Sequence, residues 1–220
     1  MAPQSITSST KASAGPTTRE RVLAAAEISF AECGYHAASM RQIATQAGVA
    51  QGLLHYHFDT KEQLYSQVVA WRAGVINASR LEMLSALGSD ASLLDILTAL
   101  YVPALGDDAG GAAFGNIMAA MLTGGELETR LVREHYDATA QVFIAAIEAA
   151  TGLGHRDAAW GYSLAIHVLV AGMARNGRTE RLADEREPAD TQAFLDRLVQ
   201  FAAGGIEGLK PPGERRVAND

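Results

Sequence analysis

The sequence predicts an all-α protein of about nine helices, because signals for helices recur along the whole chain. Apolar side chains repeat at helical spacing from the first predicted helix to the last. No alternating run of apolar and polar residues, bounded by turn residues, indicates a strand. Three capping pairs, each a Ser or Thr followed three positions later by Glu or Gln, mark helix starts: Thr17 with Glu20, Ser39 with Gln42, and Thr60 with Gln63.

The first capping pair opens a helix predicted from Thr18 to Cys33. Gly34 suits the left-handed residue just past its end. Cys33 is the only cysteine, so the chain has no internal disulfide, which agrees with a reducing compartment. We interpret Cys33 as a small core residue.

Three further helices follow in quick succession. A short second helix begins at Met40 and stops at Gly48, and a third covers residues 51–58. In the third helix Leu54 and Phe58 lie one turn apart and face inward. A fourth helix begins after the capping pair at Thr60.

Glycine, proline and charge runs divide the rest of the chain into five more helices. They are predicted at roughly 92–104, 112–123, 126–150, 157–175 and 191–207. Residues 1–16 are poor in large apolar side chains, so we expect a flexible arm there and a disordered tail at 209–220.

Composition excludes several classes of protein. With 48% apolar residues in a chain of 220, the sequence can bury a substantial core. No apolar run approaches the roughly 20 residues that a membrane-spanning helix needs, and no signal segment opens the chain. We therefore expect a soluble, cytoplasmic protein.

The net charge of −7 disfavours a non-specific architectural DNA binder, because binding to phosphates depends on Lys and Arg. The charge is unevenly distributed, however. Residues 1–72 hold six Lys or Arg against five Asp or Glu, and the remainder holds 12 against 20. Any surface that faces DNA therefore belongs to the first third of the chain.

Residues 39–58 have the layout of a helix-turn-helix, with two short helices joined by a turn that contains Gly48. In that motif the second helix enters the major groove, where each base pair presents a distinct pattern of donors and acceptors. Once Leu54 and Phe58 face the interior, the residues left on the outer side are Gln51, Gly52, His55, Tyr56 and His57.

From Ser39 the chain reads Ser-Met-Arg-Gln-Ile-Ala-x-x-Ala-Gly-Val, and from Tyr56 it reads Tyr-His-Phe-x-x-Lys-Glu-x-Leu. With these motifs, residues 18–65 resemble the TetR family of bacterial transcription regulators. The resemblance implies a DNA-binding domain, placed here at 17–64, on a helical body at 65–208 that dimerises and holds a ligand pocket. In most members of the family the ligand releases the operator.

The resemblance also implies roles for single residues. Tyr56, His57 and Lys61 would contact phosphates, while Ser39 and Arg41 would touch the DNA backbone from the second helix. Lys61 lies at the start of the fourth helix, where the helix dipole favours the same phosphate.

The resemblance does not define the operator sequence, because the chain departs from the commonest family pattern at Gln51, Leu53 and His55. Gln51 can offer its amide to adenine, and His55 can donate to guanine N7 or to a phosphate. Leu53 either contacts a thymine methyl group or packs against the first helix. Gly52 completes the predicted contact set.

Aromatic and apolar residues of the body form a candidate ligand pocket, although the same helical spacing also fits an ordinary core. The candidates are Tyr101, Phe114, Met118, Met121, Leu122, His135, Tyr136, Phe143, Trp160, Leu164 and His167.

The last two predicted helices carry apolar faces larger than one small body needs, and by resemblance they pair with their copies in a four-helix dimer interface. The apolar residues of these faces are Leu164, Val168, Ala171, Phe194, Leu198 and Phe201, and Ala171, Gly172, Ala202 and Gly205 would allow close approach.

The sequence thus predicts a ligand-responsive DNA-binding regulator, by default a repressor. It would bind a palindromic operator as a homodimer and be released by a small, largely apolar effector. Two alternatives stay open, namely a regulator without a small-molecule effector and a helical small-molecule enzyme.

We expect no cofactor, metal site or catalytic residue. His55 and His57 are two positions apart on a helix and cannot share a metal ion. Ser163 lies in a Gly161-Tyr-Ser-Leu-Ala run that lacks the preceding strand of a hydrolase nucleophile.

Overall fold

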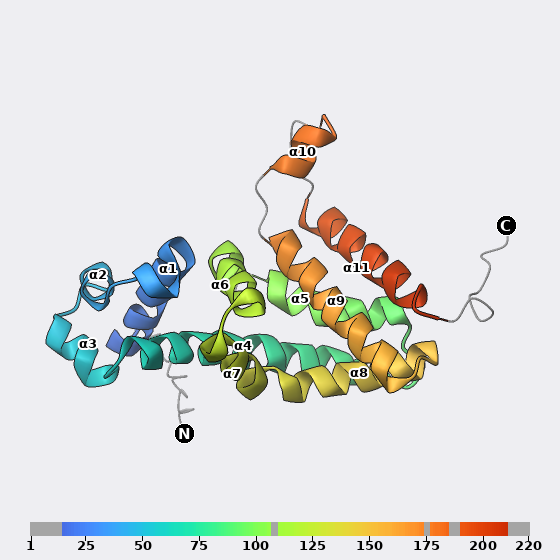
Figure 1. Cartoon of the computed structure of the whole chain (residues 1–220), viewed down its shortest axis with the longest axis horizontal. Coiled ribbons are helices and arrows are strands. Elements are labelled where there is room, and N and C mark those ends of the chain that lie inside the picture. Colours follow the sequence, from blue (N-terminus) through green and yellow to red (C-terminus); the bar gives the residue numbers. More distant parts are fainter. Residues whose placement is uncertain (1–14, 107–109, 174–176, 185–189, 211–220) are drawn as a thin grey trace, which may run out of the picture.

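The computed structural model describes residues 15–106, 110–173, 177–184 and 190–210. Within these ranges the chain forms helices and no strands, which confirms the prediction of an all-α fold (Figure 1). The helices are α1 (Thr18–Ala37), α2 (Met40–Gln46), α3 (Gln51–His57), α4 (Lys61–Ala86), α5 (Leu93–Leu105), α6 (Gly111–Thr123), α7 (Glu126–His135), α8 (Asp137–Thr151), α9 (His155–Met173), α10 (Arg178–Leu182) and α11 (Thr191–Glu207). The predicted arm and tail fall mostly outside the described residues.

The helices α1 to α3 form a small head on the first turns of α4. Its centre is apolar: Leu54 and Phe58 are fully buried, as the helical spacing predicted. Phe30 of α1 packs edge-on against Tyr65 of α4, with ring centroids 5.0 Å apart. Gly48 turns the chain between α2 and α3 with φ of 65°, a left-handed conformation that glycine adopts readily.

Two of the three predicted capping interactions form. The Thr17 hydroxyl accepts from the amide of Glu20 and the Glu20 carboxylate accepts from the amide of Thr17, which makes a complete capping box. Thr60 caps α4 by accepting from the amide of Gln63. Ser39 precedes α2 but makes no side-chain capping hydrogen bond, so the expected pair with Gln42 is absent.

The end of α1 differs from the prediction. The helix continues through a kink at Gly34, where φ is 74°, to Ala37. The interpretation of Cys33 as a core residue was wrong, because this side chain is exposed. The last buried position of α1 is Phe30, but the final turns of the helix still pack on α4, because the ring of Tyr35 lies 5.0 Å from that of Tyr65.

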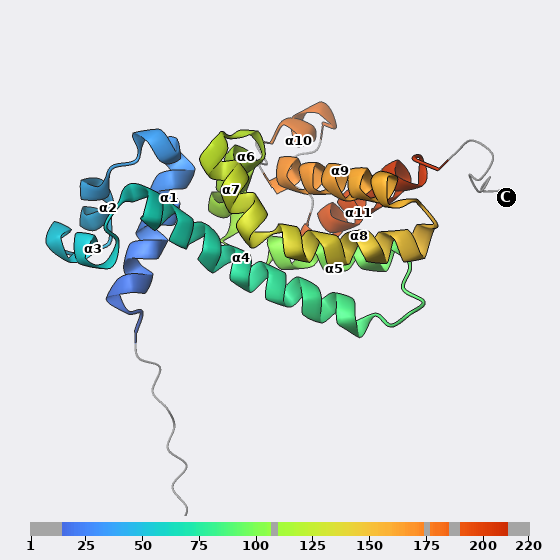
Figure 2. The same cartoon turned by 60° about the horizontal axis from the view of Figure 1, so that its bottom comes forward.

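The body consists of α5 to α9 and α11 packed along the rest of α4 (Figure 1). Its core includes the fully buried rings of Tyr101, Phe114 and Phe143. Helices α9 and α11 lie side by side in both views, and α6 packs against α1, so that head and body are in direct contact (Figure 2).

Two helices were not anticipated by the sequence. The predicted helix 126–150 is broken at Tyr136, whose φ of −123° ends α7 before α8 begins. No glycine or proline marks this break. Instead Tyr136 is buried, and the side-chain amide of Asn77 on α4 donates to the carbonyl of His135 at 2.8 Å, which replaces a hydrogen bond within the helix. The other addition is the one-turn helix α10, inside the charged run predicted as a break.

Candidate functional site

The third helix lies at the outer edge of the head, on the side away from the body (Figures 1 and 2). Its first three residues, Gln51, Gly52 and Leu53, are exposed, as are His55 and Tyr56. The Tyr56 ring is 83% exposed, which is unusual for a large aromatic side chain. Because the inner side of α3 is fixed in the core, these groups form a rigid outer surface.

Gly52 is open to solvent on this surface. A Cβ atom placed there would have no neighbour within 4 Å, so the packing of the head does not require a glycine at this position. A missing side chain on an exposed helix instead leaves room for close approach of a partner to the backbone.

The second helix contributes Ser39 and Arg41 beside this surface. Ser39 is half-buried at the N-terminus of α2 and its hydroxyl is not used in a cap, while Arg41 is exposed on the first turn. His57 is half-buried at the end of α3, and its ring lies edge-on against that of Tyr56 at 5.4 Å. The predicted contact residues from α2 and α3 are thus brought together on the head.

Lys61, predicted as a phosphate contact, makes contacts within the head in the absence of DNA. Its ammonium group donates to the carbonyl of His36 at 2.9 Å and to that of Ala38 at 3.2 Å, and it lies 4.8 Å from the centre of the Tyr35 ring. These contacts satisfy carbonyl groups at the end of α1 and pair a cation with an aromatic face. The structure therefore uses Lys61 to hold the end of α1 against the start of α4.

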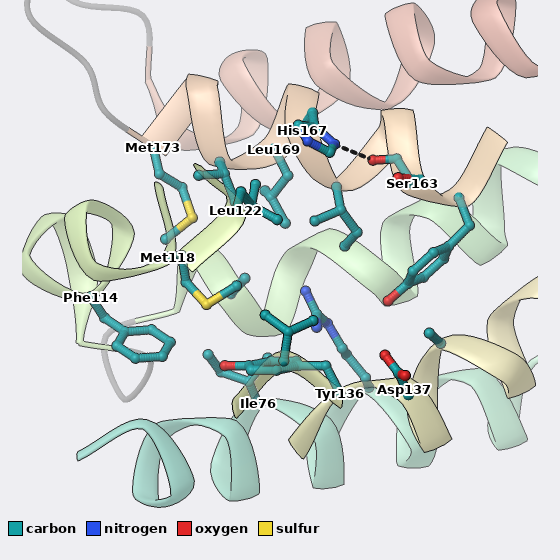
Figure 3. Close-up of a pocket in the computed structure, with 17 residues that line it drawn as sticks. Ile76, Phe114, Met118, Leu122, Tyr136, Asp137, Ser163, His167, Leu169 and Met173 are labelled. Carbon is teal, nitrogen blue, oxygen red and sulfur yellow. Dashed lines mark hydrogen bonds between the residues drawn. The ribbon is translucent and has the colours of Figure 1, made fainter. Parts of the chain in front are cut away.

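A second site lies inside the body, where α4 to α9 enclose a cavity of about 210 Å³ (Figure 3). Five of the residues predicted from the sequence line it: Phe114, Met118, Leu122, Tyr136 and His167. The rest of the lining was not predicted from the sequence and consists of Ile76, Arg80, Ala104, Val132, Asp137, Ala140, Tyr162, Ser163, Ile166, Leu169, Val170 and Met173.

The other six predicted pocket residues lie elsewhere, for different reasons. Tyr101, Met121 and Phe143 are buried in the core, and the Tyr101 hydroxyl donates to the carbonyl of Ala165 at 2.8 Å. His135 is half-buried at the end of α7, whereas Trp160 and Leu164 are more than half exposed on α9. Helical spacing shows which side chains share a face, but it does not show which helix that face meets.

Burial shifts the pKa of three polar side chains that line the cavity. It raises the pKa of Tyr136 and Tyr162, while the positive charge of Arg80 offsets part of this effect on both. Burial also lowers the pKa of Arg80. The one missed residue with a signal in the sequence is Arg80, because it continues the apolar face of α4 marked by Val69, Ala73 and Ile76.

Ser163 has surroundings unlike those of a hydrolase nucleophile. It lies within α9, and its backbone carbonyl is 2.7 Å from Nδ1 of His167. Among the described residues no cluster of three or more His, Cys, Asp or Glu could hold a metal ion.

Comparison with known protein families accounts for both parts of the molecule. Residues 22–68 match the profile of "Bacterial regulatory proteins, tetR family", and residues 97–205 match that of "Tetracyclin repressor-like, C-terminal domain". The chain belongs to the TetR family. It is therefore a DNA-binding transcriptional regulator with a helix-turn-helix head and a helical C-terminal domain, and not an enzyme.

Several relatives described as HTH-type transcriptional regulators match over part of the chain. UidR of Escherichia coli K12 is 40% identical over 52 residues, which is 24% of this chain and 26% of UidR. The activator FasR of Mycolicibacterium smegmatis is 45% identical over 51 residues, or 23% of each chain. The repressor KstR2 of Rhodococcus jostii is 33% identical over 84 residues, or 38% of this chain and 41% of KstR2. The match thus spans about a quarter of the length of UidR and FasR.

Solved TetR structures share the fold over most of the chain. A TetR regulator from Legionella pneumophila aligns with a TM-score of 0.61 at 19% identity, over 86% of this chain and 97% of that one. FadR of Bacillus subtilis, solved with stearoyl-CoA, aligns with a TM-score of 0.60 at 18% identity, over 84% and 97% of the two chains.

In the part of the chain that the structure describes, no helix is both long enough and apolar enough to cross a membrane.

Proposed function

We propose that this TetR regulator binds a palindromic operator as a homodimer through α3, and that a small, largely apolar effector in the body cavity releases it. The default sign is repression. The observation that carries the DNA-binding part is the outer surface of α3, where Tyr56 is 83% exposed while Leu54 and Phe58 are buried behind it. A helix held in this way can enter a major groove without rearrangement of the head.

The proposed DNA contacts follow from this surface. Gln51, Gly52, Leu53 and His55 face the base edges, with His55 also within reach of a phosphate. The residues that contact the DNA backbone are Ser39, Arg41, Tyr56 and His57. Leu53 is 40% exposed, which favours contact with a thymine methyl group over packing inside the head.

Dimerisation is supported by apolar residues that remain exposed on α9 and α11. Phe201 is 72% exposed, Trp160 57% and Leu164 51%, and the two helices lie side by side (Figure 1). Large apolar side chains left exposed on neighbouring helices are typical of interaction surfaces. Gly172, expected to allow contact between subunits, is used within the chain, because a Cβ there would lie 3.0 Å from Leu198 and Phe194.

The cavity supports the effector part of the proposal. Most of its lining is apolar, and it lies between α4 and α9, the helices that connect the head and the proposed dimer face. An effector that binds one arrangement of the heads better than another would change operator affinity. Since the operator is chromosomal, the proposal also places the protein in the cytoplasm.

Operator binding can be tested with genomic fragments selected by the purified protein. Fluorescence anisotropy would compare the wild-type chain with Tyr56→Ala and Arg41→Ala, and with Arg133→Ala as a control that removes an exposed charge from α7. We expect Tyr56→Ala to weaken operator binding about tenfold, or about 1.4 kcal/mol. Arg41→Ala should also reduce the salt dependence of binding by about one phosphate contact.

The control variant should bind the operator as tightly as the wild type, and Tyr56→Ala should have the unfolding midpoint of the wild type. Both side chains are exposed, so their removal should not disturb the fold. Operator affinity that is unchanged in both head variants would contradict the proposed orientation of α3.

A further inference from the structure

A buried cation lies beside the cavity without a matching anion. The Arg80 side chain projects from α4, and the residue is only 4% exposed. Its Nε donates to the carbonyl of Leu100 at 2.9 Å, and Nη1 donates to the side-chain oxygen of Asn77 at 3.4 Å. Among the described residues no carboxylate forms an ion pair with Arg80, and Nη2 donates to no group.

Arg72, two turns earlier on the same helix, is by contrast paired with an anion. Its guanidinium forms two parallel hydrogen bonds with the buried carboxylate of Glu27, at 2.8 and 2.6 Å. A buried charge without such a partner is costly, and arginine does not give up its proton to avoid that cost. The contrast suggests that the partner of Arg80 comes from outside the chain.

Other polar groups at the cavity do not supply the missing anion. Tyr136 is buried, and its hydroxyl is the one buried side-chain polar atom among the described residues that has no hydrogen-bond partner. Asp137 lines the cavity but is exposed to solvent and lies outside ion-pair distance of Arg80. His167 is exposed and engaged with the carbonyl of Ser163. A ligand can therefore satisfy both an unpaired donor and an unpaired charge.

The remainder of the lining is apolar. Figure 3 shows Phe114, Met118, Leu122 and Met173 gathered at one end and Asp137 toward the other, while the ring of Tyr136 reaches toward Phe114. A site of this composition favours a molecule with one anionic group and a compact apolar body.

We propose that the cavity binds a small amphipathic organic acid, with its anionic group on the guanidinium of Arg80 and its apolar body against α6 and α9. This inference deepens the proposed function, because it names the chemical class of the effector.

The proposal can be tested by calorimetry on the full chain with octanoate and decanoate, each compared with the alcohol and the amine of the same chain length. We expect the acids to bind at least tenfold more tightly than the alcohols, and the amines most weakly. Arg80→Gln should remove the preference of acid over alcohol, while Arg80→Lys, which keeps the charge, should retain part of it.

Two results would overturn the inference: no binding of either acid by the wild-type chain, or alcohols that bind as tightly as the acids. Since these are wild-type measurements, they decide the matter even if Arg80→Gln does not fold. Tyr136→Phe provides a further check, since it removes only the unpaired hydroxyl and should leave folding intact.

Release of operator DNA is measured separately. Acid binding that depends on Arg80 but leaves operator affinity unchanged would support the ligand class and contradict the effector role. An alcohol that binds better than its acid and releases the operator would support the effector role of the cavity and contradict the proposed ligand class.

Discussion

Lys61 illustrates how a single side chain can take a role that its position in a motif does not show. The family motif predicts a phosphate contact, whereas the structure directs the ammonium group to the carbonyls of His36 and Ala38. A lysine that satisfies two carbonyls at the end of a helix stabilises the fold, and it has little freedom to reach DNA at the same time.

Lys61→Met should therefore lower stability more than it lowers operator affinity. We expect the free energy of unfolding to fall by about 1–2 kcal/mol, because two carbonyls lose a charged donor. Urea unfolding and anisotropy on the same preparation would check this. A variant with unchanged stability and a weaker salt dependence of DNA binding would instead support the phosphate contact predicted from the motif.

At the scale of elements, the start of α6 lies directly over the ion pair that joins α1 to α4. Gly110 precedes this helix with φ of 87°, and a Cβ there would lie 2.3 Å from Oε1 of Glu27 and 2.9 Å from Nε of Arg72. Three helices from the head and the body thus meet at one point, and glycine is the residue that lets them do so.

Gly110→Ala should destabilise the protein through this junction. Gly111→Ala is a matched control, because Gly111 also has a positive φ, of 56°, but a Cβ there would have no neighbour within 4 Å. We expect the control to lose about 1 kcal/mol from backbone strain and Gly110→Ala to lose at least about 2 kcal/mol more, since the buried ion pair must shift. Equal losses in urea unfolding would show that the ion pair tolerates the methyl group.

At the scale of the whole molecule, the exposed apolar residues of α9 and α11 predict where two copies of the chain associate. If the proposed dimer forms through this face, Phe201→Asp should give a monomer and weaken operator binding, because it places a charge in an apolar interface. Leu182→Asp is the control, since Leu182 is 73% exposed on α10 and lies outside the α9 and α11 faces. Sedimentation velocity would check both variants. A dimer that persists in Phe201→Asp would place the interface elsewhere.

Burial of several tyrosines predicts how the stability of the protein changes at alkaline pH. Burial raises the pKa of Tyr65 to about 12 from an ordinary value of 10, and it also raises the pKa of Tyr101, Tyr136 and Tyr162. The folded protein therefore holds these protons when the unfolded chain has lost them. The contribution of these protonated tyrosines to the free energy of unfolding is fully present below pH 10 and is lost as the pH rises through the folded-state pKa values.

Urea unfolding between pH 8 and pH 11 should thus show a free energy of unfolding that is nearly constant up to about pH 10 and then falls. Tyr136→Phe should make this fall less steep by removing one of the titrating groups. A wild-type curve that stays flat to pH 11 would contradict the assignment of these phenols to the interior.

Features that depend on near neighbours in the chain could be predicted before the structure was known. Helix starts at Thr17 and Thr60, the turn at Gly48 and the outward face of α3 all follow from spacing and capping, because a helix relates residues only a few positions apart. The same signals predicted nine helices and not the break at Tyr136, which has no local cause.

Features that depend on contacts between distant segments could not be predicted in this way and became visible in the packed helices. Asn77 reaches the end of α7 across 58 positions and Lys61 reaches α1 across 23 and 25, while Arg80 is left facing the cavity without an anion. Spacing along one helix shows which side chains share a face. The partner of that face is decided when the helices pack, because burial and hydrogen bonding then select one neighbour among many.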